Sequence, residues 1–240
     1  MQLSGKTVLV TGGTDGIGAQ LIRQLRDKGA TVITQGRNAE RCAATKADGF
    51  EVIQADLSSQ KGVDTLLAGV QGRQIDILVN NAGAGVDHDF REAAPDLAAS
   101  DATIFLNLNA PIRLIAALMP VLKARPEAMI VNVTSGLAIA PRAGGPVYCA
   151  TKAALRSYSQ ALRHQLQGTT VHVLEALPPV VETKLTAGRG SKKMAPDACA
   201  RQIVAGMESN AEEANVGAVK VLQLVHSISP KLARKIMIRF

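Results

Sequence analysis

Tyr148 and Lys152 stand four residues apart, and Ser135 lies a short distance upstream of the tyrosine. If the run around them is helical, residues i and i+4 share one face, so the phenol and the ammonium point the same way. A nearby ammonium favours the phenolate and lowers the phenol pKa from its ordinary value of about 10. With a serine hydroxyl to hold a carbonyl oxygen, this set could exchange a proton with a substrate. Helices also carry such pairs by chance, so the significance of this spacing depends on what the rest of the chain contains.

The composition excludes several classes of protein. The chain has 240 residues, enough for one large α/β domain, and a net charge of +7. Aromatic residues make up only 2% of it, and no basic run carries interleaved aromatics for base stacking, so we expect no nucleic-acid partner. Cys42, Cys149 and Cys199 are too few for a disulfide framework. The run Asp87-His88-Asp89 has no second His or Cys at ligand spacing, so we predict no metal site.

The N-terminal residues run straight into an apolar strand, without the pattern of a signal peptide. We also expect no apolar stretch close to the roughly 20 residues of a membrane span. These features predict a cytoplasmic protein.

Short apolar runs alternate with helical stretches. The predicted strands are Thr7–Val10, Thr31–Thr34, Glu51–Ile53, Ile75–Val79, Met129–Val133 and Val171–Leu174. The predicted helices are Gly18–Lys28, Ala39–Ala47, Lys61–Val70, Leu97–Lys123 and Val147–Gln167. This alternation indicates the α/β class: a single doubly wound, Rossmann-type parallel sheet with helices on both faces, spanning residues 1–240. Ligands are expected at the carboxyl ends of the strands.

Polar and small residues follow the predicted strands. The first strand runs into Thr11-Gly12-Gly13-Thr14-Asp15-Gly16-Ile17-Gly18 and a helix, so its backbone can approach a pyrophosphate at a helix N-terminus. The spacing Gly-x-x-x-Gly-x-Gly differs from the Gly-x-Gly-x-x-Gly fingerprint. Asp56 follows the third strand, where it could accept a hydrogen bond from an adenine amino group. Asn80-Asn81-Ala82-Gly83 follows the fourth. This edge of the sheet is therefore a candidate dinucleotide site.

These elements, with Ser135 and Tyr-x-x-x-Lys, occur in the order found in short-chain dehydrogenases/reductases, which the chain resembles from about residue 5 to 185. The resemblance implies an NAD(P)-dependent oxidoreductase acting on a carbonyl or secondary alcohol, and a homodimer or homotetramer. The implied catalytic residues are Asn107, Ser135, Tyr148 and Lys152. The implied cofactor-binding residues are Gly12, Thr14, Asp15, Gly16, Ile17, Gly18, Arg37, Asp56, Leu57, Asn81, Ala82, Gly83, Tyr148, Lys152, Pro178, Val181 and Thr183.

Segments 133–138, 162–166 and 177–183 further resemble the branch that contains the oxidoreductase of the D-alanine–teichoic acid operon. Apolar residues around Ser135 and before Tyr148 favour a hydrophobic carbonyl substrate; they include Leu137, Ile139, Ala143 and Pro146. A non-catalytic NADP-binding sensor or scaffold is the alternative function, although such a protein would usually have lost one of the four catalytic residues.

The end of the second predicted strand favours NADP(H), while NAD(H) stays possible. Gln35 is neutral where an acidic residue would bind the ribose of NAD, and Arg37 can pair with a 2′-phosphate. Asp15 argues against NADP(H), because related NADP-dependent enzymes often have a basic residue at the position of Asp15.

Asn107 stands four residues before Pro111, which has no N–H to bond the Asn107 carbonyl. We expect a kink there and hypothesise that the freed carbonyl holds a water that relays protons to Lys152. A tolerated proline kink explains the sequence equally well, and the resemblance favours the relay. Asn109 is a rival for the asparagine role but lacks this relation to the proline. Glu175, at the end of an apolar strand, needs a partner that the sequence does not identify.

The C-terminal part predicts two more features. The resemblance implies that residues from about 185 to 200 form a substrate lid. Many relatives end with a last strand and a Gly-Gly that pack in a tetramer interface, and this chain departs from that pattern. Residues 216–240 contain five Lys/Arg and no Asp/Glu, and form a basic amphipathic tail with apolar residues at helical spacing: Val221, Val225, Ile228, Leu232 and Ile236. Ser229-Pro230 predicts the start of a second helix. We expect the tail to pack on the protein or a second subunit, and place a membrane surface second.

Overall fold

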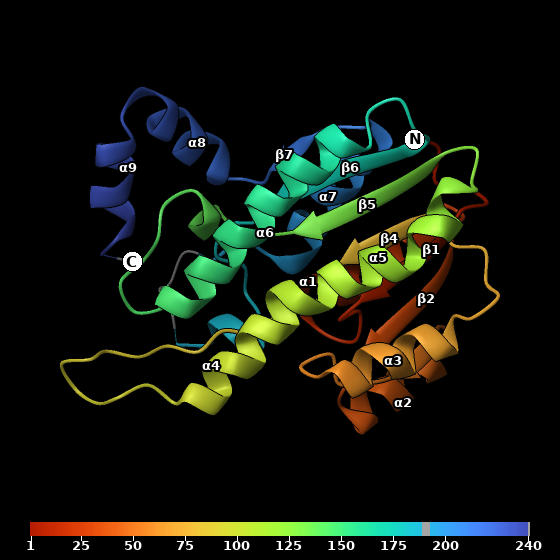
Figure 1. Cartoon of the computed structure of the whole chain (residues 1–240), viewed down its shortest axis with the longest axis horizontal. Helices are drawn as coiled ribbons and strands as arrows, with labels where there is room; N and C mark the ends of the chain where they lie inside the picture. Colours follow the sequence, from red (N-terminus) through yellow and green to blue (C-terminus); the bar gives the residue numbers. More distant parts are fainter. Residues whose placement is uncertain (189–192, 240) are drawn as a thin grey trace.

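A computed structural model describes residues 1–188 and 193–239. Over these residues the chain forms a seven-stranded parallel sheet in the order β3-β2-β1-β4-β5-β6-β7 (Figure 1). The strands are β1 (Thr7–Thr11), β2 (Thr31–Gly36), β3 (Glu51–Gln54), β4 (Ile77–Asn80), β5 (Ala128–Val133), β6 (Val171–Leu177) and β7 (Glu213–Asn215). Because β1 lies between β2 and β4, the chain reverses direction across the sheet there, and a crevice opens beyond their carboxyl ends.

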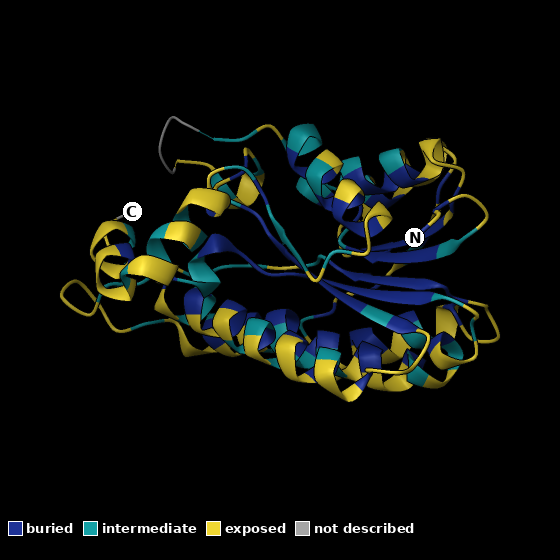
Figure 2. Ribbon diagram, turned by 90° about the horizontal axis from the view of Figure 1, so that it is seen from above, coloured by how far each residue is buried: buried dark blue, intermediate teal, exposed yellow. Residues whose placement is uncertain are grey.

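Helices cover both faces of the sheet (Figure 2). The main ones are α1 (Gly16–Asp27), α2 (Ala39–Ala47), α3 (Gln60–Gly69), α4 (Leu97–Ile104), α5 (Ala110–Lys123), α6 (Pro146–Gln165), α7 (Pro196–Glu208), α8 (Val219–Ile228) and α9 (Pro230–Met237). A π-helical turn, η1 (Phe105–Asn109), joins α4 to α5, and two 3-10 turns are η2 (Gly136–Ala138) and η3 (Lys184–Thr186). The predicted fold class is confirmed.

Alternate residues of each strand enter two separate hydrophobic cores, as expected for a sheet buried on both faces. Val8 and Val10 of β1 face the core formed with α1 and α7. Leu9, between them, faces the core formed with α3, α5 and α6. The loops that carry the predicted catalytic and cofactor-binding residues therefore extend from strands whose ends are fixed on both sides.

One α-helix and one strand were not predicted. α7 begins with Pro196 at its first turn and buries Cys199, Ile203 and Met207 against α1 and the sheet. β7 pairs with β6 at the edge of the sheet, and the chain continues beyond it into two further helices. β7 is only three residues long, Glu-Ala-Asn, and its pattern carries no apolar alternation. Pairing with the buried strand β6, rather than intrinsic preference, makes it a strand.

The run from Leu97 to Lys123 is continuous helix, as predicted, but with a π-helical turn in its middle. Within these 27 residues an 18-residue stretch has a mean hydropathy of 1.6, so the prediction of no apolar stretch of membrane-spanning length was wrong by length and composition. Core helices satisfy the same criterion. Here Leu114, Ile115 and Leu122 are buried in the core beneath the sheet.

Candidate active site

The loops at the carboxyl ends of the strands enclose a cavity of about 490 Å³. Thirteen of the seventeen predicted cofactor-binding residues line it: Gly12, Thr14, Asp15, Gly16, Ile17, Gly18, Arg37, Asp56, Leu57, Asn81, Ala82, Gly83 and Thr183. The other four, Tyr148, Lys152, Pro178 and Val181, do not. The sequence reasoning missed six lining residues: Gln35, Gly36, Arg41, Leu106, Lys184 and Leu185. This size suits a cofactor pocket.

The glycine loop is shaped by contacts that leave no room for side chains. Gly12 has φ +69°, and a Cβ there would lie 2.9 Å from the Ala82 Cα. A Cβ at Gly18 would lie 2.1 Å from the Gly12 carbonyl oxygen. The Asn81 side-chain amide donates to the carbonyls of Thr11 and Gly12, which ties the loop after β4 to the glycine loop. Backbone therefore forms this wall of the cavity next to the N-terminus of α1, which is a cradle that fits a dinucleotide pyrophosphate.

Asp15 lies between two cations at the cavity rim. Its carboxylate caps α1 by accepting from the Gly16 N–H at 2.8 Å. The same side chain lies 3.2 Å from the Arg41 guanidinium and 3.8 Å from the Lys184 ammonium. Lys184 begins η3, directly before the predicted lid, so this pair joins the segment that leads into the lid to the glycine loop. Residues 189–192 of the lid lie outside the part of the chain that the structure describes.

Gln35 is buried and holds the backbone around the cavity. Its side-chain oxygen accepts from the Gly12 N–H at 3.0 Å, and its amide donates to the Ala55 carbonyl at 2.5 Å. Arg37, two residues on, is exposed and lines the cavity. The basic side chains that line the cavity are therefore Arg37, Arg41 and Lys184, of which only Arg37 was predicted.

Lys152 is almost fully buried, and its ammonium donates to the Val133 carbonyl at 2.9 Å. Burial lowers the pKa of Lys152 to about 8. A Cβ added at Gly83 would lie 3.4 Å from this ammonium and 3.3 Å from the Asn107 side-chain oxygen. The structure thus brings Lys152, Asn107 and the loop after β4 together at the inner end of the cofactor site.

Asn107 lies in η1, where the Ala110 N–H bonds the Phe105 carbonyl, a π-helical pattern. Pro111 has no N–H to continue the α-helical ladder, which explains a register change at this position. The fully buried Asn107 side chain accepts from the Ala84 N–H and donates to the Ala84 carbonyl and the Thr151 hydroxyl. Asn107 therefore joins α6 to the loop after β4.

Tyr148 lies in the first turns of α6 and is partly exposed. The Lys152 ammonium lies 5.8 Å from the centre of its ring, so the two side chains share a face of α6 as predicted. A Cβ at Gly85 would lie 3.3 Å from the ring, so the absence of a side chain there makes room for it. Ser135 is buried at the end of β5, and its hydroxyl accepts from the Leu137 N–H.

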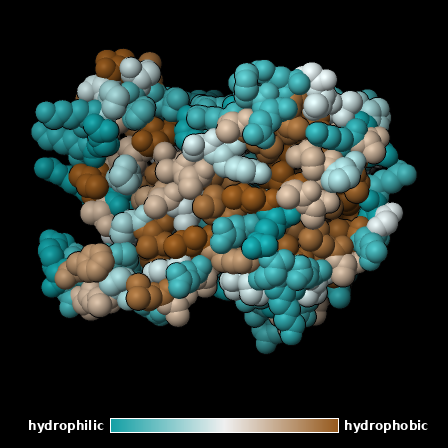
Figure 3. Space-filling model, in the orientation of Figure 1, coloured by the Kyte–Doolittle hydropathy of each residue, from teal (hydrophilic) through white to brown (hydrophobic). Residues whose placement is uncertain are grey.

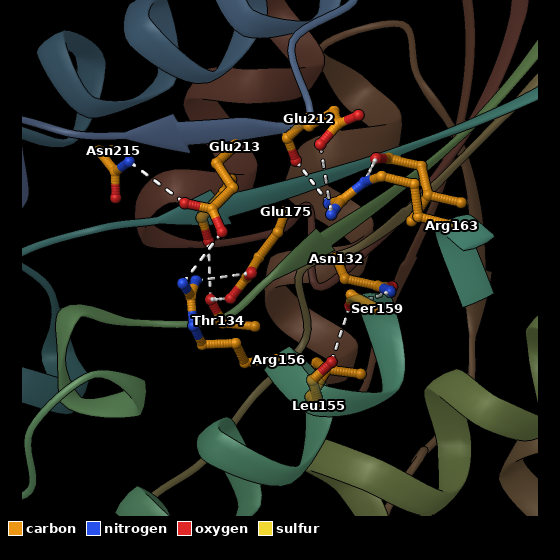
Figure 4. A network of polar contacts seen from close by, with 12 residues as sticks. Asn132, Thr134, Leu155, Arg156, Ser159, Arg163, Glu175, Glu212, Glu213 and Asn215 are labelled. Carbon is orange, nitrogen blue, oxygen red and sulfur yellow. Dashed lines mark hydrogen bonds and ion pairs between the residues drawn. The ribbon is translucent and has the colours of Figure 1, made fainter. Parts of the chain in front are cut away.

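A buried polar network lies behind Ser135 and supplies the partner of Glu175 that the sequence left open (Figure 4). The Glu175 carboxylate accepts from the Thr134 hydroxyl at 2.7 Å and pairs with Arg156 at 2.8 Å. Arg156 also pairs with Glu213 of β7 at 3.0 Å. Burial raises the pKa of Glu175, which the Thr134 hydrogen bond and Arg156 partly offset. The network joins β5, β6, β7 and α6.

Residues 6–194 match the family model for short chain dehydrogenases. The chain belongs to this family. It is 43% identical over 189 residues to an uncharacterized oxidoreductase, DltE, of Bacillus subtilis, covering 77% of this chain and 75% of that protein. It is 36% identical over 181 residues to the NADP-dependent 3-hydroxy acid dehydrogenase YdfG of Salmonella typhi, covering 72% of each.

A short chain dehydrogenase from Burkholderia cenocepacia, solved in complex with NADP, has a similar fold, with a TM-score of 0.88 and 24% identity over 99% of each chain. Membership of the short-chain dehydrogenase family makes the protein an oxidoreductase enzyme. The similarity to DltE agrees with the branch that the sequence motifs indicated, which contains the oxidoreductase of the D-alanine–teichoic acid operon. The alternative of a protein without enzymatic activity is therefore not favoured.

Proposed function

We propose that this short-chain dehydrogenase transfers a hydride between NADP(H) and a carbonyl or secondary-alcohol substrate, with Tyr148 as the acid and base. One observation carries the proposal. The buried Lys152 ammonium shares a face of α6 with the Tyr148 ring and lies beside Asn107 at the inner end of the cavity. A cation held in this way favours the phenolate and prepares the tyrosine for proton transfer.

The residues of the site then have separate roles. Tyr148 donates a proton to the carbonyl oxygen during reduction and accepts it during oxidation. Ser135 orients this oxygen and stabilises its developing negative charge. The glycine loop and the N-terminus of α1 hold the cofactor, and Thr183 lines the cavity opposite Gly16. A bound nicotinamide supplies the hydride chemistry itself.

The rim of the cavity supports a preference for NADP(H) over NAD(H). Arg37 and Arg41 both line it, and guanidinium groups bind phosphate in charge-assisted pairs. The name of the relative from Salmonella typhi points the same way. Asp15 weakens the preference, because its carboxylate already occupies Arg41. We therefore propose that a 2′-phosphate competes with Asp15 for Arg41.

A proton path to Lys152 completes the proposal. The π-helical turn and Pro111 alter the hydrogen bonding around the Asn107 carbonyl, and we infer that this carbonyl holds a water that exchanges protons with Lys152. The Asn107 side chain is engaged elsewhere, with Ala84 and Thr151. The Asn107 side chain therefore fixes the turn, and the Asn107 backbone carbonyl binds the water.

The substrate class follows from two observations. Leu137, Ile139 and Ala143 present apolar surface near Ser135, and none of them is buried. The Salmonella typhi relative is named for 3-hydroxy acids. We propose a small, largely apolar carbonyl compound or hydroxy acid, turned over by a homodimer or homotetramer.

A substrate panel tests the function directly. Aldehydes, ketones and 3-hydroxy acids are offered with NADPH, NADH and their oxidised forms, and absorbance of the reduced nicotinamide is followed. We expect turnover with at least one class, faster with NADP(H). Cofactor binding measured by calorimetry without turnover of any compound would instead indicate a dinucleotide sensor.

A further inference from the structure

The C-terminal helices α8 and α9 carry an apolar face that the rest of the described chain leaves uncovered. They lie together beyond one end of the sheet, apart from the helices that cover its faces (Figure 1). Ser229 separates them, and its hydroxyl caps α9 by accepting from the Leu232 N–H, as the sequence predicted. Phe240, the last residue of the predicted tail, lies outside the described residues.

Each of the two helices exposes large apolar side chains. Val221, Leu224 and Ile228 of α8 are spaced for one face and are 63%, 61% and 78% exposed. On α9 and just beyond it, Leu232, Ile236 and Ile238 are also exposed. These six are more than half of the eleven large exposed hydrophobic side chains in the described residues. An apolar concentration of this kind marks an interaction surface.

The same segment is strongly basic. Five exposed cations accompany these apolar side chains: Lys220, Lys231, Arg234, Lys235 and Arg239. Residues 216–240 contain no Asp or Glu, and no carboxylate of the described residues pairs with these cations. In Figure 3, hydrophobic and hydrophilic residues alternate over the region where Figure 1 places α8 and α9. A partner complementary to this surface is therefore both apolar and negatively charged.

A second copy of the chain meets this requirement poorly. In a two-fold dimer the same patch lies on both sides of the interface, so the five cations of each copy would face one another. The segment has no carboxylate to pair with them, and like charges placed together oppose association. Anionic lipid has both properties, since aliphatic side chains enter the acyl boundary while lysine and arginine contact headgroup phosphates.

We propose that α8 and α9 dock the protein on an anionic membrane surface. The docking face is joined to the candidate active site. A Cβ at Gly136, next to Ser135, would lie 3.0 Å from Val219 of α8. The Ala143 N–H, in the loop before Tyr148, donates to the Ile238 carbonyl at 3.1 Å. Docking therefore sets the two loops that flank the catalytic residues about one helix diameter, roughly 10 Å, from the lipid.

Vesicle co-sedimentation with the full chain tests this. One set of vesicles contains equal parts of phosphatidylglycerol and phosphatidylcholine, and the other contains phosphatidylcholine alone. We expect the wild-type protein to pellet with the anionic vesicles and to be released by high salt. A triple substitution, Lys231→Glu, Arg234→Glu and Lys235→Glu, should lower the partition constant at least about tenfold. Leu224→Asp with Ile228→Asp should lower it similarly.

The matched control is the triple substitution Lys46→Glu, Lys61→Glu and Lys123→Glu, which makes the same change in net charge at exposed positions elsewhere. It should retain most of the binding. Equal pelleting of the two triple variants, or no pelleting of the wild type, would overturn the proposal. So would gel filtration showing that the α8–α9 variants convert a dimer to a monomer while vesicles bind nothing. The wild-type lipid and salt comparisons decide the matter even if a variant fails to fold.

Discussion

The guanidinium of Arg156 lies 2.8 Å from the carboxylate of Glu175, a side chain with no exposed surface. Arg156 is one turn of α6 beyond Lys152, and Thr134, which also bonds Glu175, directly precedes Ser135. The pair thus ties the helix that carries Tyr148 and Lys152 to the strand end that carries Ser135. It positions the candidate catalytic residues without touching the cofactor cavity.

Glu175→Gln should change how the stability of the protein depends on pH. Burial raises the folded-state pKa of Glu175 above its unfolded value near 4.5, so the folded state holds this proton more tightly. Its contribution to stability is full below pH 4.5 and is lost as pH rises through the folded-state pKa. Glutamine cannot titrate, so the variant should gain stability relative to the wild type over that range.

Urea unfolding between pH 4 and 8, with Glu212→Gln at an exposed position as control, measures this effect. Parallel stability curves for the wild type and Glu175→Gln would contradict it.

Lys152→Met should relieve the cost of a buried ammonium in the cofactor-free protein. The folded-state pKa is lowered from 10.5 to about 8, so the folded state disfavours the charged form. The penalty is present below pH 8 and disappears as pH rises from 8 to 10.5, which is worth about 3 kcal/mol at most.

Thermal unfolding of both proteins across this range should therefore show the wild type gaining stability relative to Lys152→Met. A difference that does not depend on pH would show that the ammonium is not destabilised by burial. Turnover should be lost in the variant at every pH.

Arg37→Ala should weaken binding of NADPH by roughly ten- to a hundredfold, the value of a hydrogen-bonded charge pair of 1.5–3 kcal/mol. NADH lacks the 2′-phosphate, so its affinity should hardly change. Fluorescence titration with both cofactors measures the ratio, and Arg41→Ala tests whether the second guanidinium shares the phosphate. Equal losses for NADPH and NADH would show that Arg37 binds some other part of the cofactor.

Asp15→Asn should tighten NADPH binding about fivefold, because it removes a negative charge that now lies 3.2 Å from Arg41. Asparagine keeps a side-chain oxygen to cap α1, so the helix should be preserved. NADH affinity serves as the internal control and should stay the same. Weaker NADPH binding would instead mean that the Asp15 pairs with Arg41 and Lys184 hold the cavity in its binding shape.

The parts of the site that sequence could predict are those fixed by local rules. Glycine spacing, strand–helix alternation and the i, i+4 relation of Tyr148 and Lys152 all act over a few residues. Pro111 marked the place where the helix departs from α geometry, because a missing N–H is a property of one residue, although a π-helical turn was not foreseen.

Contacts between distant segments could not be read in this way. Arg41 belongs to α2 and reaches Asp15 only after the sheet has placed β1 beside β2. Arg156 and Glu175 meet only because α6 packs on β6. β7 is a strand because it pairs with β6. α7 did carry a local signal, since Cys199, Ile203 and Met207 follow Pro196 at helical spacing.

Tyr148→Phe provides the most direct test of the proposed chemistry. Phenylalanine keeps the ring that packs beside Gly85 and removes only the hydroxyl. Single-turnover measurements with bound NADPH and a substrate found in the panel should show hydride transfer slowed at least about a hundredfold, with cofactor affinity unchanged. Hydride transfer at the wild-type rate in Tyr148→Phe would contradict the assignment of Tyr148 as the acid.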